Sequence, residues 1–189
     1  MRITKPTLKQ IPWYLKPFFW RQQKKYGQVL APALVWATVP KLFIAVSSLY
    51  GVLIRKNSPL SPVLRSLITV RISQINWCRF CVNINSATLI QQTGSEAKVD
   101  ALAEWQESAI FSEQEKAALD YAEKITYSDQ QVDEACFNEL KQYFDEKAIV
   151  ELTALIAFQN LSSKFNSALD IEPQGFCLRA DTHLPEDKS

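Results

Sequence analysis

This 189-residue sequence contains few glycines and a single histidine, and its net charge is close to zero. The four glycines stand at isolated positions, which excludes the glycine-rich loops that hold nucleotide phosphates. The formal net charge is +1, from 21 Lys and Arg against 20 Asp and Glu. Nucleic-acid binding needs clustered positive charge, and basic residues gather only in residues 16–25. We therefore expect no nucleic-acid partner.

Long uninterrupted apolar runs are also lacking. Residues 1–16 contain no apolar core of the length that a secretory signal needs. Residues 28–54 are mostly apolar, but Pro32 and Pro40 interrupt them, and Lys41 would be costly in lipid. We interpret this segment as two buried helices and expect no membrane contact. Four cysteines without a signal sequence then predict a reducing, cytoplasmic compartment.

The sequence does contain apolar residues at helical spacing nearly throughout. Residues 58–75 begin with turn signals, and apolar residues then recur every three or four positions, at Leu64, Leu67, Ile68, Ile72 and Ile75. This periodicity and the scarcity of glycine predict an all-α fold, and the length suits one domain with a substantial core. Asn76 is predicted to cap a helix that ends at Gly94, and Ser112 to form a capping box with Glu115.

Two cysteines, Cys78 and Cys81, stand at the predicted start of that helix. A spacing of i and i+3 puts both sulfur atoms on one helix face, within reach of a disulfide. The partial positive charge of a helix N-terminus favours the thiolate, which is the nucleophile in reactions with disulfides and peroxides. The pair therefore predicts redox chemistry, while the isolated Cys136 and Cys177 are interpreted as small, half-buried residues.

Two other interpretations of the pair stay open. A structural zinc site needs four ligands, but the other cysteines are far apart and the single histidine, His183, lies near the C-terminus. We accordingly expect no metal and no cofactor. Alternatively, the two cysteines are simply packed in a helix. Trp77 and Phe80 are expected to line or cover the pair and exclude water, which would raise the thiol pKa, although Phe80 is first of all a core residue.

Three segments resemble one family. They are "SLITVRISQINWCRFCVNINSATLIQQTG", "SEQEKAALDYAEKIT" and "AFQNLSSKFNSALDI", in this order. They resemble the AhpD-like, carboxymuconolactone decarboxylase superfamily, in particular its alkylhydroperoxidase (peroxidase-related) branch. The resemblance runs over residues 26–171, which leaves an N-terminal arm of residues 1–25 and a C-terminal tail of residues 172–189. It implies an all-α domain that assembles into homo-oligomers through broad apolar helix faces.

The resemblance also implies an activity, that of a thiol-dependent peroxidase or thiol–disulfide oxidoreductase with an antioxidant role. By position, Cys81 would attack a peroxide and Cys78 would close the disulfide. The helix dipole alone would instead make Cys78 the more acidic thiol. The partners implied are a peroxide or disulfide substrate and a thiol reductant.

The chain departs from the family pattern at the proton relay. Asn85 stands where the pattern has histidine, and Ser66 where it has glutamate. Neither residue can transfer a proton near neutral pH, and loss of a general base typically slows a reaction about a hundredfold to ten-thousandfold. Ser66, Thr69 and Ser73 share a helix face, where they hydrogen-bond either a thiolate or only each other and the backbone.

A carboxylate from elsewhere in the chain is a candidate replacement for the relay, and Glu151 is one such residue. A second functional hypothesis also follows from the missing relay. In it, the chain has kept the fold and lost the catalysis, and acts as a redox-sensitive oligomeric binding scaffold.

Overall fold

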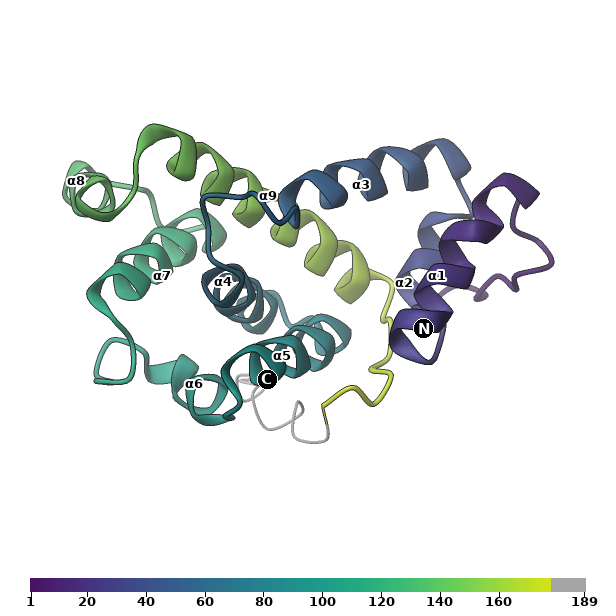
Figure 1. The fold of residues 1–189 in the computed structure, drawn as a ribbon, viewed down its shortest axis with the longest axis horizontal. Helices are drawn as coiled ribbons and strands as arrows, with labels where there is room; N and C mark the ends of the chain where they lie inside the picture. Colours follow the sequence, from purple (N-terminus) through teal and green to yellow (C-terminus); the bar gives the residue numbers. More distant parts are fainter. Residues whose placement is uncertain (178–189) are drawn as a thin grey trace.

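The computed structural model describes residues 1–177, and the interpretations that concern His183 and the rest of residues 178–189 lie outside this range. Within the described range the chain forms helices and loops and no strand, so the predicted all-α fold is confirmed (Figure 1). The helices are η1 (Trp13–Leu15), α1 (Lys16–Tyr26), α2 (Ala31–Trp36), α3 (Pro40–Leu53), α4 (Pro62–Ile75), α5 (Arg79–Thr93), α6 (Ala97–Asp100), η2 (Ala101–Glu104), α7 (Glu113–Thr126), α8 (Glu134–Tyr143) and α9 (Glu146–Ala168).

Helix α4 lies in the middle of the main bundle, with α5, α7 and α9 around it (Figure 1). It is apolar on more than one side, and Leu67, Ile68 and Ile72 are fully shielded from solvent. Ser61 caps its N-terminus by accepting a hydrogen bond from the backbone N–H of Leu64. Burial of one large apolar side chain contributes about 1.5–3 kcal/mol, so this central helix is a main source of the bundle's stability.

The N-terminal helices form a smaller core of their own at one end of the molecule (Figure 1). Phe19 of α1 stacks on Phe43 of α3 with 5.5 Å between the ring centroids. Ile11, Leu15 and Leu34 complete this core. Residues 1–25 are thus partly helical and pack on α2 and the beginning of α3.

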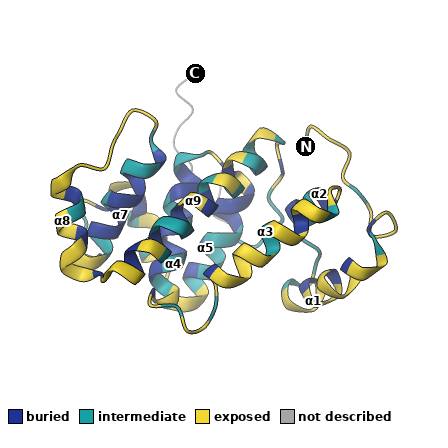
Figure 2. Cartoon of the chain, turned by 90° about the horizontal axis from the view of Figure 1, so that it is seen from above, coloured by how far each residue is buried: buried dark blue, intermediate teal, exposed yellow. Residues whose placement is uncertain are grey.

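Helix α3 differs from the expectation of two buried helices in residues 28–54. Helix α2 is mostly buried, but α3 buries only Phe43 and Leu53 and exposes most of its other side chains (Figure 2). The reason is its position, because α3 links the N-terminal core to the bundle and packs on each only locally (Figure 1). In residues 1–177, no helix has the length and the apolar character needed to cross a membrane.

The predicted helix ends agree with the structure in two of three places. Ser112 and Glu115 form the expected capping box, and α5 ends at Gly94 in the left-handed conformation. Asn76 is the exception, because it is the C-cap of α4 and not the N-cap of α5. Its side chain instead donates hydrogen bonds to Asn160 Oδ1 at 2.8 Å and Ser163 Oγ at 2.9 Å.

Candidate functional site

Cys78 is itself the N-cap of α5. Its sulfur accepts a hydrogen bond from the backbone N–H of Cys81 at 3.2 Å. The preceding residue, Trp77, has a φ of 55°, a left-handed conformation that turns the chain between α4 and α5. The helix therefore begins two residues later than predicted, and both sulfur atoms lie in its first turn. The positively polarised helix end that was expected at the pair is present.

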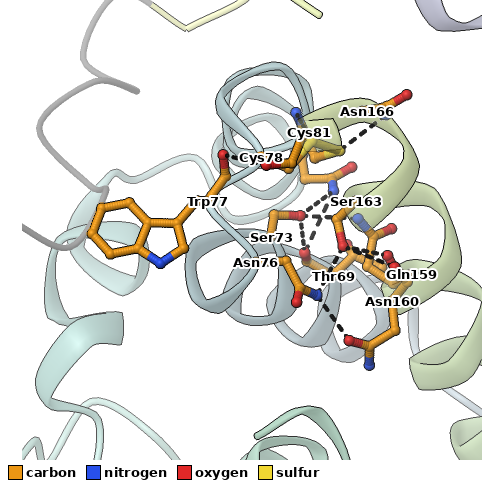
Figure 3. Close-up of a disulfide and its surroundings, with 12 residues drawn as sticks. Thr69, Ser73, Asn76, Trp77, Cys78, Cys81, Gln159, Asn160, Ser163 and Asn166 are labelled. Atoms are coloured by element: carbon orange, nitrogen blue, oxygen red, sulfur yellow. Dashed lines mark hydrogen bonds between the residues drawn. A yellow bond between two sulfur atoms is a disulfide. The ribbon is translucent and has the colours of Figure 1, made fainter. Parts of the chain in front are cut away.

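The two cysteines are joined in a disulfide, with 5.2 Å between their Cα atoms (Figure 3). Both residues are buried, with exposed fractions of 1% for Cys78 and 3% for Cys81. They also belong to an apolar cluster that includes Phe80, Val35 and Ile171. The pair can thus exist in an oxidised form inside the folded chain.

Only one of the two cysteines lines a cavity. A cavity of about 460 Å³ lies between the N-terminal helices and the bundle, with walls from α1, α2, α3, α5 and α9. Cys81 lines it together with Asn85, Phe80 and Asn166, whereas Cys78 is not among the lining residues. Most of the wall is apolar and much of it aromatic, including Trp36 and Phe158. A molecule in this cavity would therefore meet Cys81 first.

A set of uncharged polar groups from α4, α5 and α9 forms a hydrogen-bond network centred on Ser73. Ser73 Oγ accepts hydrogen bonds from Asn85 Nδ2 at 3.2 Å and from Gln159 Nε2 at 2.9 Å, and donates to the Thr69 carbonyl at 2.5 Å (Figure 3). Ser73 is fully buried. These groups are mutually satisfied, which agrees with the simpler of the two interpretations of this helix face.

Asn166 of α9 contacts the sulfur directly. Its Nδ2 donates to Cys81 Sγ at 3.2 Å, and its Oδ1 is buried with no hydrogen-bond partner among the described residues (Figure 3). Sequence reasoning missed both Asn166 and Gln159. The available signal was a polar stripe on an apolar helix, because Gln159, Ser163 and Asn166 recur at spacings of four and three.

Two residues expected near the site lie elsewhere. Ser66 is buried in α4 but does not line the cavity, and its carbonyl accepts a hydrogen bond from Thr69 Oγ1 at 3.0 Å. Trp77 is 44% exposed, and its indole ring points away from the sulfur atoms (Figure 3). Phe80, between the cysteines, does line the cavity.

Glu151, the candidate replacement carboxylate, is engaged away from the cavity. It forms an ion pair with Arg55 and accepts a hydrogen bond from Ser58 at 2.9 Å. Burial raises the pKa of Glu151, but the hydrogen bonds from Arg55 and Ser58 outweigh it, so the pKa lies below the ordinary value. A carboxylate in this state is a poor base at neutral pH and does not supply the relay in this arrangement.

The described part of the C-terminal tail is held against the start of α5. Asn83 donates to the Cys177 carbonyl at 2.6 Å and accepts from the Phe176 N–H at 2.8 Å. Arg79 forms an ion pair with Glu172 at 3.6 Å. Within residues 1–177, no three side chains of His, Cys, Asp or Glu are grouped so that they could hold a metal ion.

Comparison with known proteins agrees with this geometry. Residues 40–124 match the model of the carboxymuconolactone decarboxylase family. The uncharacterized protein YnjA of Escherichia coli strain K12 is 45% identical over 184 residues, which cover 97% of this chain and 98% of YnjA. The chain belongs to the carboxymuconolactone decarboxylase family.

Several solved structures share the fold. An uncharacterized peroxidase-related protein from Ralstonia eutropha JMP134, described as an alkylhydroperoxidase AhpD core, has a TM-score of 0.84 and 25% identity, covering 98% of this chain and 97% of that chain. The debrominase Bmp8 has a TM-score of 0.83 and 24% identity, covering 97% of each chain. A Bmp8 variant has also been solved in complex with 2,3,4-tribromopyrrole.

Proposed function

We propose that this family member is a thiol-dependent peroxidase in which Cys81 is the attacking and Cys78 the resolving residue. The observation that carries the proposal is the position of Cys81, which lies in the first turn of α5, within disulfide distance of Cys78 and on the wall of a cavity. Homology supports the same assignment, since the peroxidase-related AhpD core from Ralstonia eutropha shares the fold.

The reaction has two steps. The Cys81 thiolate attacks the terminal oxygen of a hydroperoxide, the O–O bond breaks, and the products are a sulfenic acid on Cys81 and an alkoxide that takes a proton to become the alcohol. The Cys78 thiolate then attacks the Cys81 sulfur and displaces hydroxide, which leaves as water after protonation. Two thiols are oxidised and one peroxide is reduced. An external thiol reductant opens the disulfide and completes the cycle.

The proton relay is replaced by neutral hydrogen-bond donors. Asn166 Nδ2 lies 3.2 Å from Cys81 Sγ, and in the reduced protein this N–H can stabilise a thiolate without accepting its proton. Solvent, and not a protein base, then takes the thiol proton. We therefore expect a slower enzyme than one with a His–Glu relay, by about a hundredfold or more.

The test is the oxidation of fully reduced, full-length protein by tert-butyl hydroperoxide, followed by mass spectrometry of the peptide that spans both cysteines. We expect a loss of two hydrogen atoms per chain, reversed by dithiothreitol. The Cys78→Ser variant should stop at the Cys81 sulfenic acid, which dimedone traps. The Cys81→Ser variant should react only at the rate of a free thiol.

A second candidate function is the redox-sensitive scaffold. The observation that favours it is that Ser73, Asn85 and Gln159 bond one another, and that within residues 1–177 the cavity lining beside Cys81 contains no histidine and no carboxylate. A dithiol that stays reduced under excess peroxide, in a protein whose oligomer size nevertheless changes with a disulfide-forming reagent such as diamide, would establish the scaffold and exclude the peroxidase. We infer that the protein, whether it is a peroxidase or a scaffold, is a homo-oligomer that acts in the cytoplasm.

A further inference from the structure

The lining of the cavity beside Cys81 contains cationic side chains, which a site for neutral peroxides does not need. Two cations, Arg21 and Lys25, line it from α1, four residues apart and therefore on one helix face. Its described lining contains no carboxylate. The rest of the wall is largely apolar. The combination of an apolar chamber with cations on one wall is complementary to an amphipathic anion.

Neither cation is neutralised by the protein. Both side chains are exposed, and within residues 1–177 neither has a carboxylate partner within 4 Å. The Lys25 ammonium lies 4.6 Å from the Tyr26 ring centroid, a contact that leaves its N–H groups free to bind an anion. An arginine fork and an ammonium on one face are the pair of groups that bind a carboxylate most readily.

A second, independent feature lies in the lining of the same cavity. Asn166 lines it and is only 2% exposed, yet its Oδ1 has no hydrogen-bond partner in the described structure. A buried acceptor left unpaired costs free energy, and such groups in native proteins are usually explained by a missing ligand or water. The companion Nδ2 of the same amide is bonded to the Cys81 sulfur. The unpaired oxygen thus lies beside the reacting atom, where a hydroperoxide O–H would bring a donor.

We propose that the substrate of this site is an organic hydroperoxide with a bulky apolar body and a carboxylate, held with the carboxylate at Arg21 and Lys25 and the peroxide O–H at Asn166. The inference rests on the proposed peroxidase function and adds the substrate class. The volume of about 460 Å³ suits a body of this kind, because pockets for organic ligands of moderate size span about 300–1,000 Å³. Hydrogen peroxide and small neutral peroxides would fill only a corner of it.

The binding test uses the oxidised full-length protein, so that it does not depend on peroxidase activity. Calorimetric titrations would compare laurate with methyl laurate, and 2-naphthoate with methyl 2-naphthoate, which separates a lipid-like body from an aromatic one. We expect at least one acid to bind about tenfold more tightly than its own ester. Arg21→Gln and Lys25→Gln should each remove most of that preference. Lys24→Gln, with the same charge loss on the same helix but outside the cavity lining, should not.

The two hypotheses fail in different ways. Equal binding of acid and ester, or equal losses in the Lys24→Gln and Lys25→Gln variants, would overturn the substrate class. A dithiol that reacts with neither tert-butyl hydroperoxide nor 13-hydroperoxy-linoleate would overturn the peroxidase. Where both hold, 13-hydroperoxy-linoleate should oxidise the reduced wild-type protein faster than its methyl ester does, and Asn166→Leu should slow both. Equal rates for the acid and the ester would also overturn the substrate class.

Discussion

Residue 85 is the position at which we expect an amide in place of a relay histidine. Asn85 lines the cavity one turn after Cys81, and its amide donates to Ser73 Oγ at 3.2 Å. An amide can orient a neighbouring group but cannot accept a proton at neutral pH. Asn85 therefore cannot act as a general base for Cys81.

Replacement of Asn85 by histidine should restore part of the relay. The imidazole would occupy the site of the amide, beside Ser73 and on the same helix face as the sulfur atoms, and act as a general base for the thiol. We expect the second-order rate constant for tert-butyl hydroperoxide at pH 7 to rise at least about tenfold, measured by stopped-flow intrinsic fluorescence. Asn85→Gln, which keeps an amide, is the control. A histidine variant no faster than the glutamine variant would show that the base is not what limits the rate.

Glu151 gives a prediction on stability and pH. Its pKa is lowered in the folded protein, so the group stabilises the fold above its unfolded pKa of about 4.3, and this contribution is lost as pH falls through the folded value. The ion pair with Arg55 is partly exposed, with 34% of the Arg55 side chain accessible, so we assign it only about 1 kcal/mol. Glu151→Gln should lower Tm by about 2–4 °C at pH 7, and this difference should shrink as the pH falls below about 4.3. A difference that stays constant down to the acid limit of folding would point to packing instead of charge.

At the scale of the helices, the sequence predicts which segments become helical better than it predicts how the helices pack on one another. The three-to-four periodicity around Leu67 and Ile68 indicates a central helix, and Ser112 with Glu115 marks a helix start, because both signals are local. The cap of α5 depends on Trp77 adopting a positive φ between two packed helices, which is a tertiary effect. The expectation placed the cap at Asn76, where a capping residue type stands but the backbone geometry does not suit it.

The candidate site likewise contains one part that the sequence predicts and one part that depends on tertiary packing. Cys78 and Cys81 are three residues apart, so their meeting follows from helix geometry alone. Asn166 and Gln159 reach the site from α9, more than 75 residues further along the chain, and only the packing of α9 on α4 and α5 brings them there. A single sequence shows the polar stripe on α9 but not the partner that the stripe faces. The cations of α1 were visible as a basic cluster, and only the cavity gives them a role.

In the described part of the molecule, helix α3 joins the N-terminal core to the main bundle, and neither of them covers most of its surface. Helix α3 is apolar around most of its circumference, and an apolar helix of this kind is normally buried. Here Leu49 is 47% and Val52 57% exposed, and most of α3 has the colour of exposed residues in Figure 2. Exposed apolar surface of this extent marks an interface in soluble proteins. The occupant that we propose for this surface, from the family resemblance, is a second copy of this chain.

The corresponding prediction is that charge on this surface dissociates the oligomer. In the double variant Leu49→Glu and Val52→Glu, each subunit would have to bury two unpaired carboxylates, which is far more costly than the apolar contact it replaces. We expect the dissociation constant to rise by about a hundredfold or more, seen as a shift to monomer mass in size-exclusion chromatography with light scattering. Ser48→Glu, an added charge at an exposed polar position of the same helix, is the matched control for charge alone. A wild-type protein that is monomeric at micromolar concentration, or a double variant that keeps the wild-type mass, would exclude α3 as the interface. In that case the apolar surface of α3 would stay exposed in the monomer, and the double variant should be more soluble than the wild-type protein.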